Sequence, residues 1–191
     1  MIKFILSGFL IFPLWLPAQT GADTIVWSDK HLVWDNFKGN YDTAVYNRQY
    51  GAITSWKVRY QYRPLILQNR LDFTIYAWFD ANKSWTRPKN RNNKTLLLHE
   101  QGHFDLAELL SRQFRQQLSE TTFSRAGYTD SIKLIFGKLL TIAYATQHKY
   151  DAETIHGMNS RRQTYWQTFI ASELKKLEAF KDKNITARLV R

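Results

Sequence analysis

The sequence of 191 residues contains no cysteine, and this absence excludes several kinds of protein chemistry. Disulfide bonds, thiolate ligands for zinc and the acylated N-terminal cysteine of a lipoprotein are all impossible. The folded chain must therefore be held together by its hydrophobic core and by any metal that it binds.

Internal repeats and low-complexity segments are also absent, and no stretch interleaves basic residues with aromatic ones as nucleic-acid-binding segments do. The formal net charge is nevertheless +11, with lysines and arginines spread along the chain. A basic protein is attracted to anionic envelope polymers or lipid headgroups. We therefore expect an association with the cell envelope and no specific nucleic-acid partner.

The N-terminal segment has the composition of a secretory signal peptide. Lys3 is its only charge, an apolar run continues to Leu16, and Ala18 follows Pro17 at a plausible cleavage position. A membrane anchor is the alternative, but a span needs about 20 apolar residues and this run is shorter. We predict cleavage after residue 18, a periplasmic or secreted protein of charge +10 without Lys3, and no transmembrane span in the mature chain.

Residues 19–191 are expected to form a single domain of the α+β class. Residues 56–63 and 71–80 alternate apolar and polar side chains, the pattern of half-buried antiparallel strands, and an earlier strand is expected around 25–33. Helices are predicted from Lys94 to about Ser119, from about Thr129 to Lys149, and from Ser160 onward. The predicted order is an N-terminal antiparallel sheet followed by a helical part.

The first predicted helix carries His99-Glu100-Gln101-Gly102-His103, an H-E-x-x-H motif. Histidines four residues apart on a helix project from one face, so both imidazoles can bind the same ion. Zinc suits this arrangement, because two imidazoles take adjacent corners of its tetrahedron while another corner stays open to water. Glu100 is then the expected general base for that water.

A helical wheel places both histidines on an apolar stripe with Leu96, Leu106, Ala107, Leu110 and Phe114. Gly102 costs about 1 kcal/mol relative to alanine inside a helix, a loss that usually has a packing or functional reason. On the opposite side, Glu108 and Arg112 are expected to form an exposed i,i+4 pair. The alternative is a pair of buried histidines satisfied by backbone partners.

A zinc site needs a third protein ligand. The extended motif with a third histidine six residues after the second is absent, because position 109 is leucine. Among residues 147–157, His156 is the first candidate because Gly157 lets the backbone turn beside a metal. Asp151 and Glu153 are the next candidates, and Glu173 is a weaker one. The predicted zinc ligands are thus His99, His103 and His156.

Several blocks of the sequence resemble one bacterial family: LVWDNFKG at 32–39, SW at 84–85, LLHEQGHFD at 97–105, and residues 147–166. It is a domain-of-unknown-function family described as predicted secreted zinc-dependent proteases. The resemblance covers nearly all of the chain after the signal segment. It implies an exported zincin-like fold, zinc held by His99 and His103, and Glu100 as the catalytic acid.

The expected function is that of an exported zinc metallopeptidase with a peptide or protein substrate. Glu100 would take a proton from the attacking water and pass it to the leaving amine, and Tyr150, or less favourably His148, would stabilise the oxyanion. A peptidoglycan amidase is one alternative, and a non-catalytic envelope binding protein with a structural metal is another. The strand ending near Phe79 is expected at the rim of the sheet, where an extended peptide could add to it.

Overall fold

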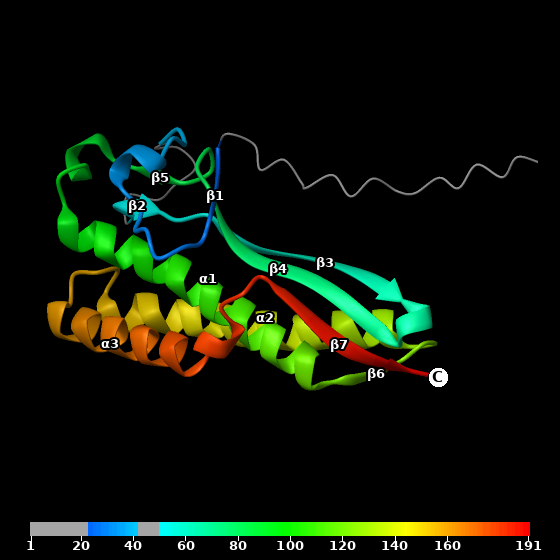
Figure 1. The fold of residues 1–191 in the computed structure, drawn as a ribbon. Helices are drawn as coiled ribbons and strands as arrows, with labels where there is room; N and C mark the ends of the chain where they lie inside the picture. Colours follow the sequence, from blue (N-terminus) through cyan, green and yellow to red (C-terminus); the bar gives the residue numbers. More distant parts are fainter. Residues whose placement is uncertain (1–22, 42–49) are drawn as a thin grey trace, which may run out of the picture.

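Residues 23–41 and 50–191 are described by the computed structural model (Figure 1). An antiparallel-rich sheet in the N-terminal half precedes three helices, which confirms the α+β class. The predicted signal peptide, residues 1–18, lies outside the described part of the chain. Among the described residues, no helix is both long enough and apolar enough to cross a membrane.

The sheet is built around β4 (Arg70–Asp80), a long strand whose alternate residues from Leu71 to Phe79 are buried. β3 (Trp56–Leu65) pairs with it along one side in a hairpin, as the alternation predicted. On the other side β1 (Thr24–Val26) pairs with one end of β4, and β7 (Asn184–Val190) with the other. The prediction that this strand forms the rim of the sheet is therefore wrong, because both of its edges are paired.

The helix α1 (Lys94–Glu120) packs against the sheet, and the helices α2 (Tyr128–Thr154) and α3 (Ser160–Lys176) pack against α1 (Figure 1). α2 also contacts β3, where the Phe136 and Tyr60 ring centroids lie 4.9 Å apart. The N-terminus of α1 is capped by Asn93, whose side chain accepts a hydrogen bond from the Leu96 amide at 3.0 Å. Side chains of α1 pack against β4 in the core, among them Phe114 and Leu118.

Glu108 and Arg112 of α1 form the predicted ion pair at 3.1 Å, but their side chains are only 4% and 2% exposed. Arg115 binds the same Glu108 oxygen at 2.6 Å. The expectation of an exposed pair is wrong because α3 and the segment after it cover this side of α1, where the Arg112 guanidinium donates to the Leu174 carbonyl at 2.7 Å. A helical wheel assumes one covered face, whereas α1 is covered on two.

The last turns of α2 differ from the predicted boundary. The helix continues to Thr154, so most of the segment expected as a linker is helical. It ends in three consecutive residues with positive φ: Ile155 at 51°, His156 at 50° and Gly157 at 81°. β-branched residues adopt this conformation rarely, and such strain costs about 1–3 kcal/mol per residue.

Two short strands lie beside the N-terminal half of α1 (Figure 1). β2 (Ala52–Ile53) and β5 (Trp85–Thr86) pair with each other in a separate small sheet. β6 (Thr122–Ser124) follows α1 and pairs with β7 in parallel. The strand expected around 25–33 is limited to β1, and a 3-10 turn, η1 (Trp34–Asn36), follows it.

Candidate metal centre

Three side chains converge where α1 and α2 pack against each other. The Nε2 atoms of His99 and His103 lie 3.2 Å apart. Oδ1 of Asp151, on the last turns of α2, lies 3.1 Å from the first and 3.0 Å from the second. These three atoms form a nearly equilateral triangle, and each belongs to a residue type that binds zinc.

Two glutamines determine which ring nitrogens carry protons. Gln147 accepts from His103 Nδ1 at 2.5 Å, and its amide nitrogen donates to the His103 backbone carbonyl at 3.0 Å. Gln163, on α3, accepts from His99 Nδ1 at 3.2 Å and donates to the Tyr150 hydroxyl at 2.7 Å. Because a backbone carbonyl can only accept, the Gln147 amide has one possible orientation, and its oxygen must face the His103 ring. The Tyr150 hydroxyl donates its proton to the His99 carbonyl at 3.0 Å, so it accepts from Gln163, whose oxygen then faces the His99 ring. In this network both histidines carry the proton on Nδ1.

With Nδ1 donating, each neutral imidazole presents Nε2 as a lone-pair acceptor, and both face a carboxylate oxygen. Three acceptors 3.0–3.2 Å apart repel one another unless a proton or a cation lies among them. Burial alone would lower the pKa of His103, but the Asp151 hydrogen bond and the charges of Asp151 and Glu100 raise it overall. Burial likewise raises the pKa of Asp151, and the two histidines lower it further than burial raises it.

His156 lies at the margin of this group. Its Nδ1 is 3.4 Å from Asp151 Oδ1, and its side chain is 39% exposed. His99, Asp151 and His156 each offer a ligand atom, all within 4.8 Å of one another. Two overlapping sets thus share His99 and Asp151, and the shorter distances belong to the set completed by His103. His156 is therefore near enough to contact a ligand bound by His99, His103 and Asp151.

The cavity in front of these residues has a volume of about 280 Å³, and we call it the metal cleft. It is lined by His99, Glu100, His103, Asp151 and His156, together with β2 and the aromatic rings Tyr50, Trp56 and Tyr144. The Glu100 side chain is buried, and its Oε2 accepts a hydrogen bond from the Thr54 hydroxyl at 2.7 Å. Thr54, directly after β2, therefore fixes the orientation of the Glu100 carboxylate.

Tyr150 supports the site from behind. Its ring stacks on His99 with centroids 4.6 Å apart, and its hydroxyl donates to the His99 carbonyl at 3.0 Å. Burial raises the pKa of this phenol, and the side chain is fully enclosed. The prediction that Tyr150 faces an oxyanion is therefore wrong. Gly102 explains the close approach: a Cβ there would lie 2.8 Å from Tyr150 Cζ.

The remaining candidates from the sequence lie in other surroundings. Glu153 points away from the cluster, where its carboxylate binds Arg162 and accepts from Trp166 Nε1 at 2.8 Å. Glu173 pairs with Lys176 at 2.5 Å near the end of α3. His148 lines the metal cleft, so it stays a candidate for contact with a substrate.

Thr54, Gln147 and Gln163 were not identified from the sequence. A signal for Gln147 exists in the spacing of Gln147, Tyr150, Asp151 and Thr154, which share one helical face as i, i+3, i+4 and i+7. Thr54 and Gln163 come from segments distant in the chain, and no local pattern marks them. No protein-family model, curated protein or solved structure matches this chain.

Proposed function

We propose that the protein is a zinc-dependent metallopeptidase whose metal ligands are His99, His103 and Asp151. The proposal rests on three bare acceptor atoms 3.0–3.2 Å apart. A tetrahedral zinc ion with bonds of about 2.0–2.1 Å holds its ligand atoms about 3.3 Å apart, so a small expansion of the triangle suffices. Two imidazoles and one carboxylate also leave one corner open, which suits a catalytic site.

A zinc ion at this position supplies Lewis acidity, which polarises a peptide carbonyl and makes a water molecule acidic enough to react near neutral pH. The chain's own contribution is the Glu100 carboxylate, which takes the proton of that water and delivers it to the leaving nitrogen. Thr54 holds one carboxylate oxygen at 2.7 Å, so the other is the one that accepts the proton.

His156 takes a different part from the one that sequence alone suggested. In this proposal its half-exposed imidazole donates a hydrogen bond to the carbonyl oxygen that becomes negative during attack. The three positive φ angles at residues 155–157 support a functional placement, since strained backbone of this kind clusters at active sites. The strain turns the ring toward the metal cleft instead of continuing the helix.

An elongated substrate fits the shape of the site. A cavity of about 590 Å³ adjoins the metal cleft and shares Tyr50, Gly51, Leu96 and His156 with it. β2 lines the cleft and, among the described strands, pairs only with β5, so a peptide backbone could pair with its other edge. The combined length of the two cavities favours an extended peptide over a compact peptidoglycan amide as the substrate. The resemblance to predicted secreted zinc-dependent proteases also supports a peptide substrate.

Metal content and hydrolysis of an unstructured protein substrate, each with and without chelator, test the proposal. Wild type should bind one zinc per chain and hydrolyse the substrate. His103→Ala and Asp151→Ala should lose the metal, whereas Glu153→Ala, the matched acid on the same helix, should keep it. Glu100→Gln should keep zinc and lose activity, because Glu100 moves the proton without touching the ion.

Four outcomes would contradict this reading. Near wild-type turnover in Glu100→Gln would remove the mechanism. Zinc loss in His156→Ala combined with zinc retention in Asp151→Ala would exchange the roles of these two residues. Stoichiometric zinc with no hydrolysis of proteins would favour the binding-protein alternative, and cleavage restricted to peptidoglycan fragments would favour the amidase.

A further inference from the structure

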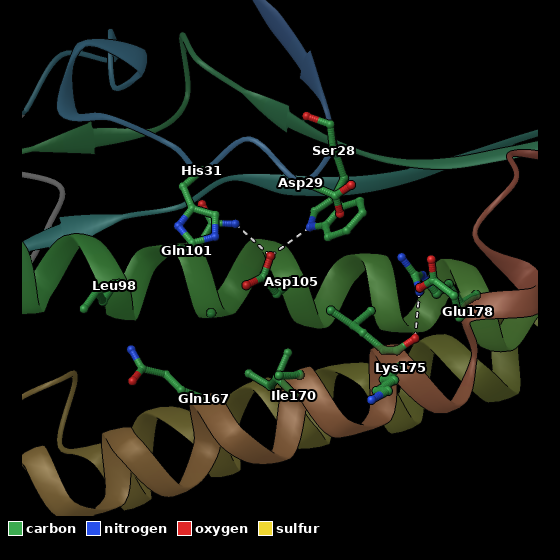
Figure 2. Close-up of a pocket in the computed structure, with 15 residues that line it drawn as sticks. Ser28, Asp29, His31, Leu98, Gln101, Asp105, Gln167, Ile170, Lys175 and Glu178 are labelled. Carbon is green, nitrogen blue, oxygen red and sulfur yellow. Dashed lines mark hydrogen bonds and ion pairs between the residues drawn. The ribbon is translucent and has the colours of Figure 1, made fainter.

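A second cavity, of about 550 Å³, lies between α1, α3 and the segment that follows β1 (Figure 2). We call it the Asp105 cavity. None of its lining residues lines the metal cleft. Its volume falls within the range of about 300–1,000 Å³ that is usual for small-molecule sites. The proposed peptidase activity assigns no task to it.

Only one of the two carboxylate oxygens of Asp105 accepts hydrogen bonds from the described residues. Oδ1 accepts two hydrogen bonds, from Trp27 Nε1 at 2.8 Å and from Gln101 Nε2 at 2.7 Å. The second oxygen accepts from no group in the described part of the chain, and Figure 2 shows it turned toward the space between α1 and α3. The carboxylate therefore lines the cavity with one oxygen that receives no hydrogen bond from the described residues.

Two basic residues near the cavity are engaged elsewhere: Arg112 binds Glu108 and Glu178, and Lys181 binds Asp29. His31 also lines the cavity. Figure 2 shows the Lys175 side chain pointing away from Asp105. The wall opposite Asp105, on α3, is mainly apolar and is formed by Ile170, Ala171 and Leu174. One side of the cavity therefore offers an anionic acceptor and the other an aliphatic surface.

We infer that the Asp105 cavity binds a small organic cation, an alkylamine or alkylguanidine of about amino-acid size. The ammonium or guanidinium group donates to the open oxygen of Asp105, and a charge-assisted hydrogen bond of this kind is stronger than a neutral one. The alkyl body lies along Ile170 and Leu174, which removes apolar surface from water. The inference is independent of the metal and stands whether or not the protein is a peptidase.

The test is isothermal titration calorimetry of the full chain at pH 7.5 with n-pentylamine and, separately, with n-pentanol. The alcohol has a shape similar to that of the amine but carries no charge. Saturable binding of the amine is expected, at least tenfold tighter than that of the alcohol. Asp105→Asn keeps an acceptor for Trp27 and Gln101 but removes the charge, and should weaken amine binding at least tenfold. Asp29→Asn, an acid on the same cavity already paired with Lys181, should change it less than twofold.

Ala171→Trp provides a second arm, because it narrows the cavity from α3 without touching Asp105. It should abolish binding of the amine while circular dichroism stays that of wild type. Equal affinity for amine and alcohol, or amine binding unchanged in Asp105→Asn or in Ala171→Trp, would overturn the inference. Absence of saturable binding to wild type would overturn it as well.

Discussion

Gly102→Ala is the most direct test of how α1 packs against Tyr150. In an open helical position this change stabilises a protein by about 1 kcal/mol, because alanine loses less conformational freedom than glycine. At position 102 the new Cβ would instead overlap the Tyr150 hydroxyl and lie 2.8 Å from Tyr150 Cζ. Tyr150 is enclosed on all sides and cannot simply rotate away.

The expected cost has two parts. Overpacking a dense core costs about 1–3 kcal/mol. Displacing the Tyr150 hydroxyl also weakens its hydrogen bonds with the His99 carbonyl and with Gln163, at about 1 kcal/mol each. After the gain of about 1 kcal/mol in helix propensity is subtracted, Gly102→Ala should lower the free energy of unfolding by about 2–4 kcal/mol.

Urea denaturation in the presence of chelator measures this change without a contribution from bound metal. Gly137→Ala is the matched control, since a Cβ at that position on α2 meets nothing within 4 Å and should stabilise the protein. In a Tyr150→Phe background, where the overlapping oxygen is absent, the cost of Gly102→Ala should fall by about 1 kcal/mol or more. Equal shifts for the two glycine substitutions would refute the packing argument.

Three further predictions follow from contacts on α1 and α2. Gly157→Ala should lower the free energy of unfolding by about 1–3 kcal/mol, because φ is +81° and a Cβ would lie 2.9 Å from the His99 Cβ; thermal denaturation measures this, and no change would contradict it. Glu108→Gln should cost about 3–5 kcal/mol in urea denaturation, since buried Arg115 and Arg112 both lose their ion pair with Glu108 and Arg112 keeps only the more exposed Glu178. A cost below about 1 kcal/mol would refute this account. The raised pKa of His103 stabilises the metal-free protein below about pH 6.5, and this stabilisation is lost as pH rises through the pKa of the folded state. The lowered pKa of Asp151 stabilises the metal-free protein above about pH 3.9, and this stabilisation is lost as pH falls through the pKa of the folded state. Unfolding free energies measured across pH should therefore peak between these values without metal and keep rising toward neutral pH with zinc, whereas parallel profiles would argue against a shared site.

The long elements could be predicted from the sequence because their periodicity is strong. Alternation along residues 71–80 reflects a strand with one face on the core, and the structure pairs it with residues 56–65 as expected. The starts of α1 at Lys94 and of α3 at Ser160 are also as predicted. β7 was missed, because its pattern is short and its partners lie more than 60 residues away in the chain.

The candidate site was predictable only as far as one helix carries it. His99 and His103 share a face by spacing alone, and Glu100 adjoins them. Asp151 was placed in a linker because the predicted helix ended at Lys149, although no glycine or proline lies between Lys149 and Gly157. Continuing the helix to Thr154 turns Asp151 inward beside Gln147. The choice between Asp151 and His156 depends on tertiary packing, which a single sequence does not display.

The pairing of β7 also determines the order in which the chain can complete its fold. β4 is synthesised early, yet its Arg70–Thr74 half gains its second neighbour only when residues 184–188 have emerged. Until then this half of β4 is an open strand edge next to the apolar side chains Leu71 and Phe73, a surface on which other chains can add strands. The helices α1 and α2, which carry the candidate metal site, are complete well before that edge is closed. During biosynthesis, the vulnerable part of this protein is therefore the distal end of the sheet and not the site itself.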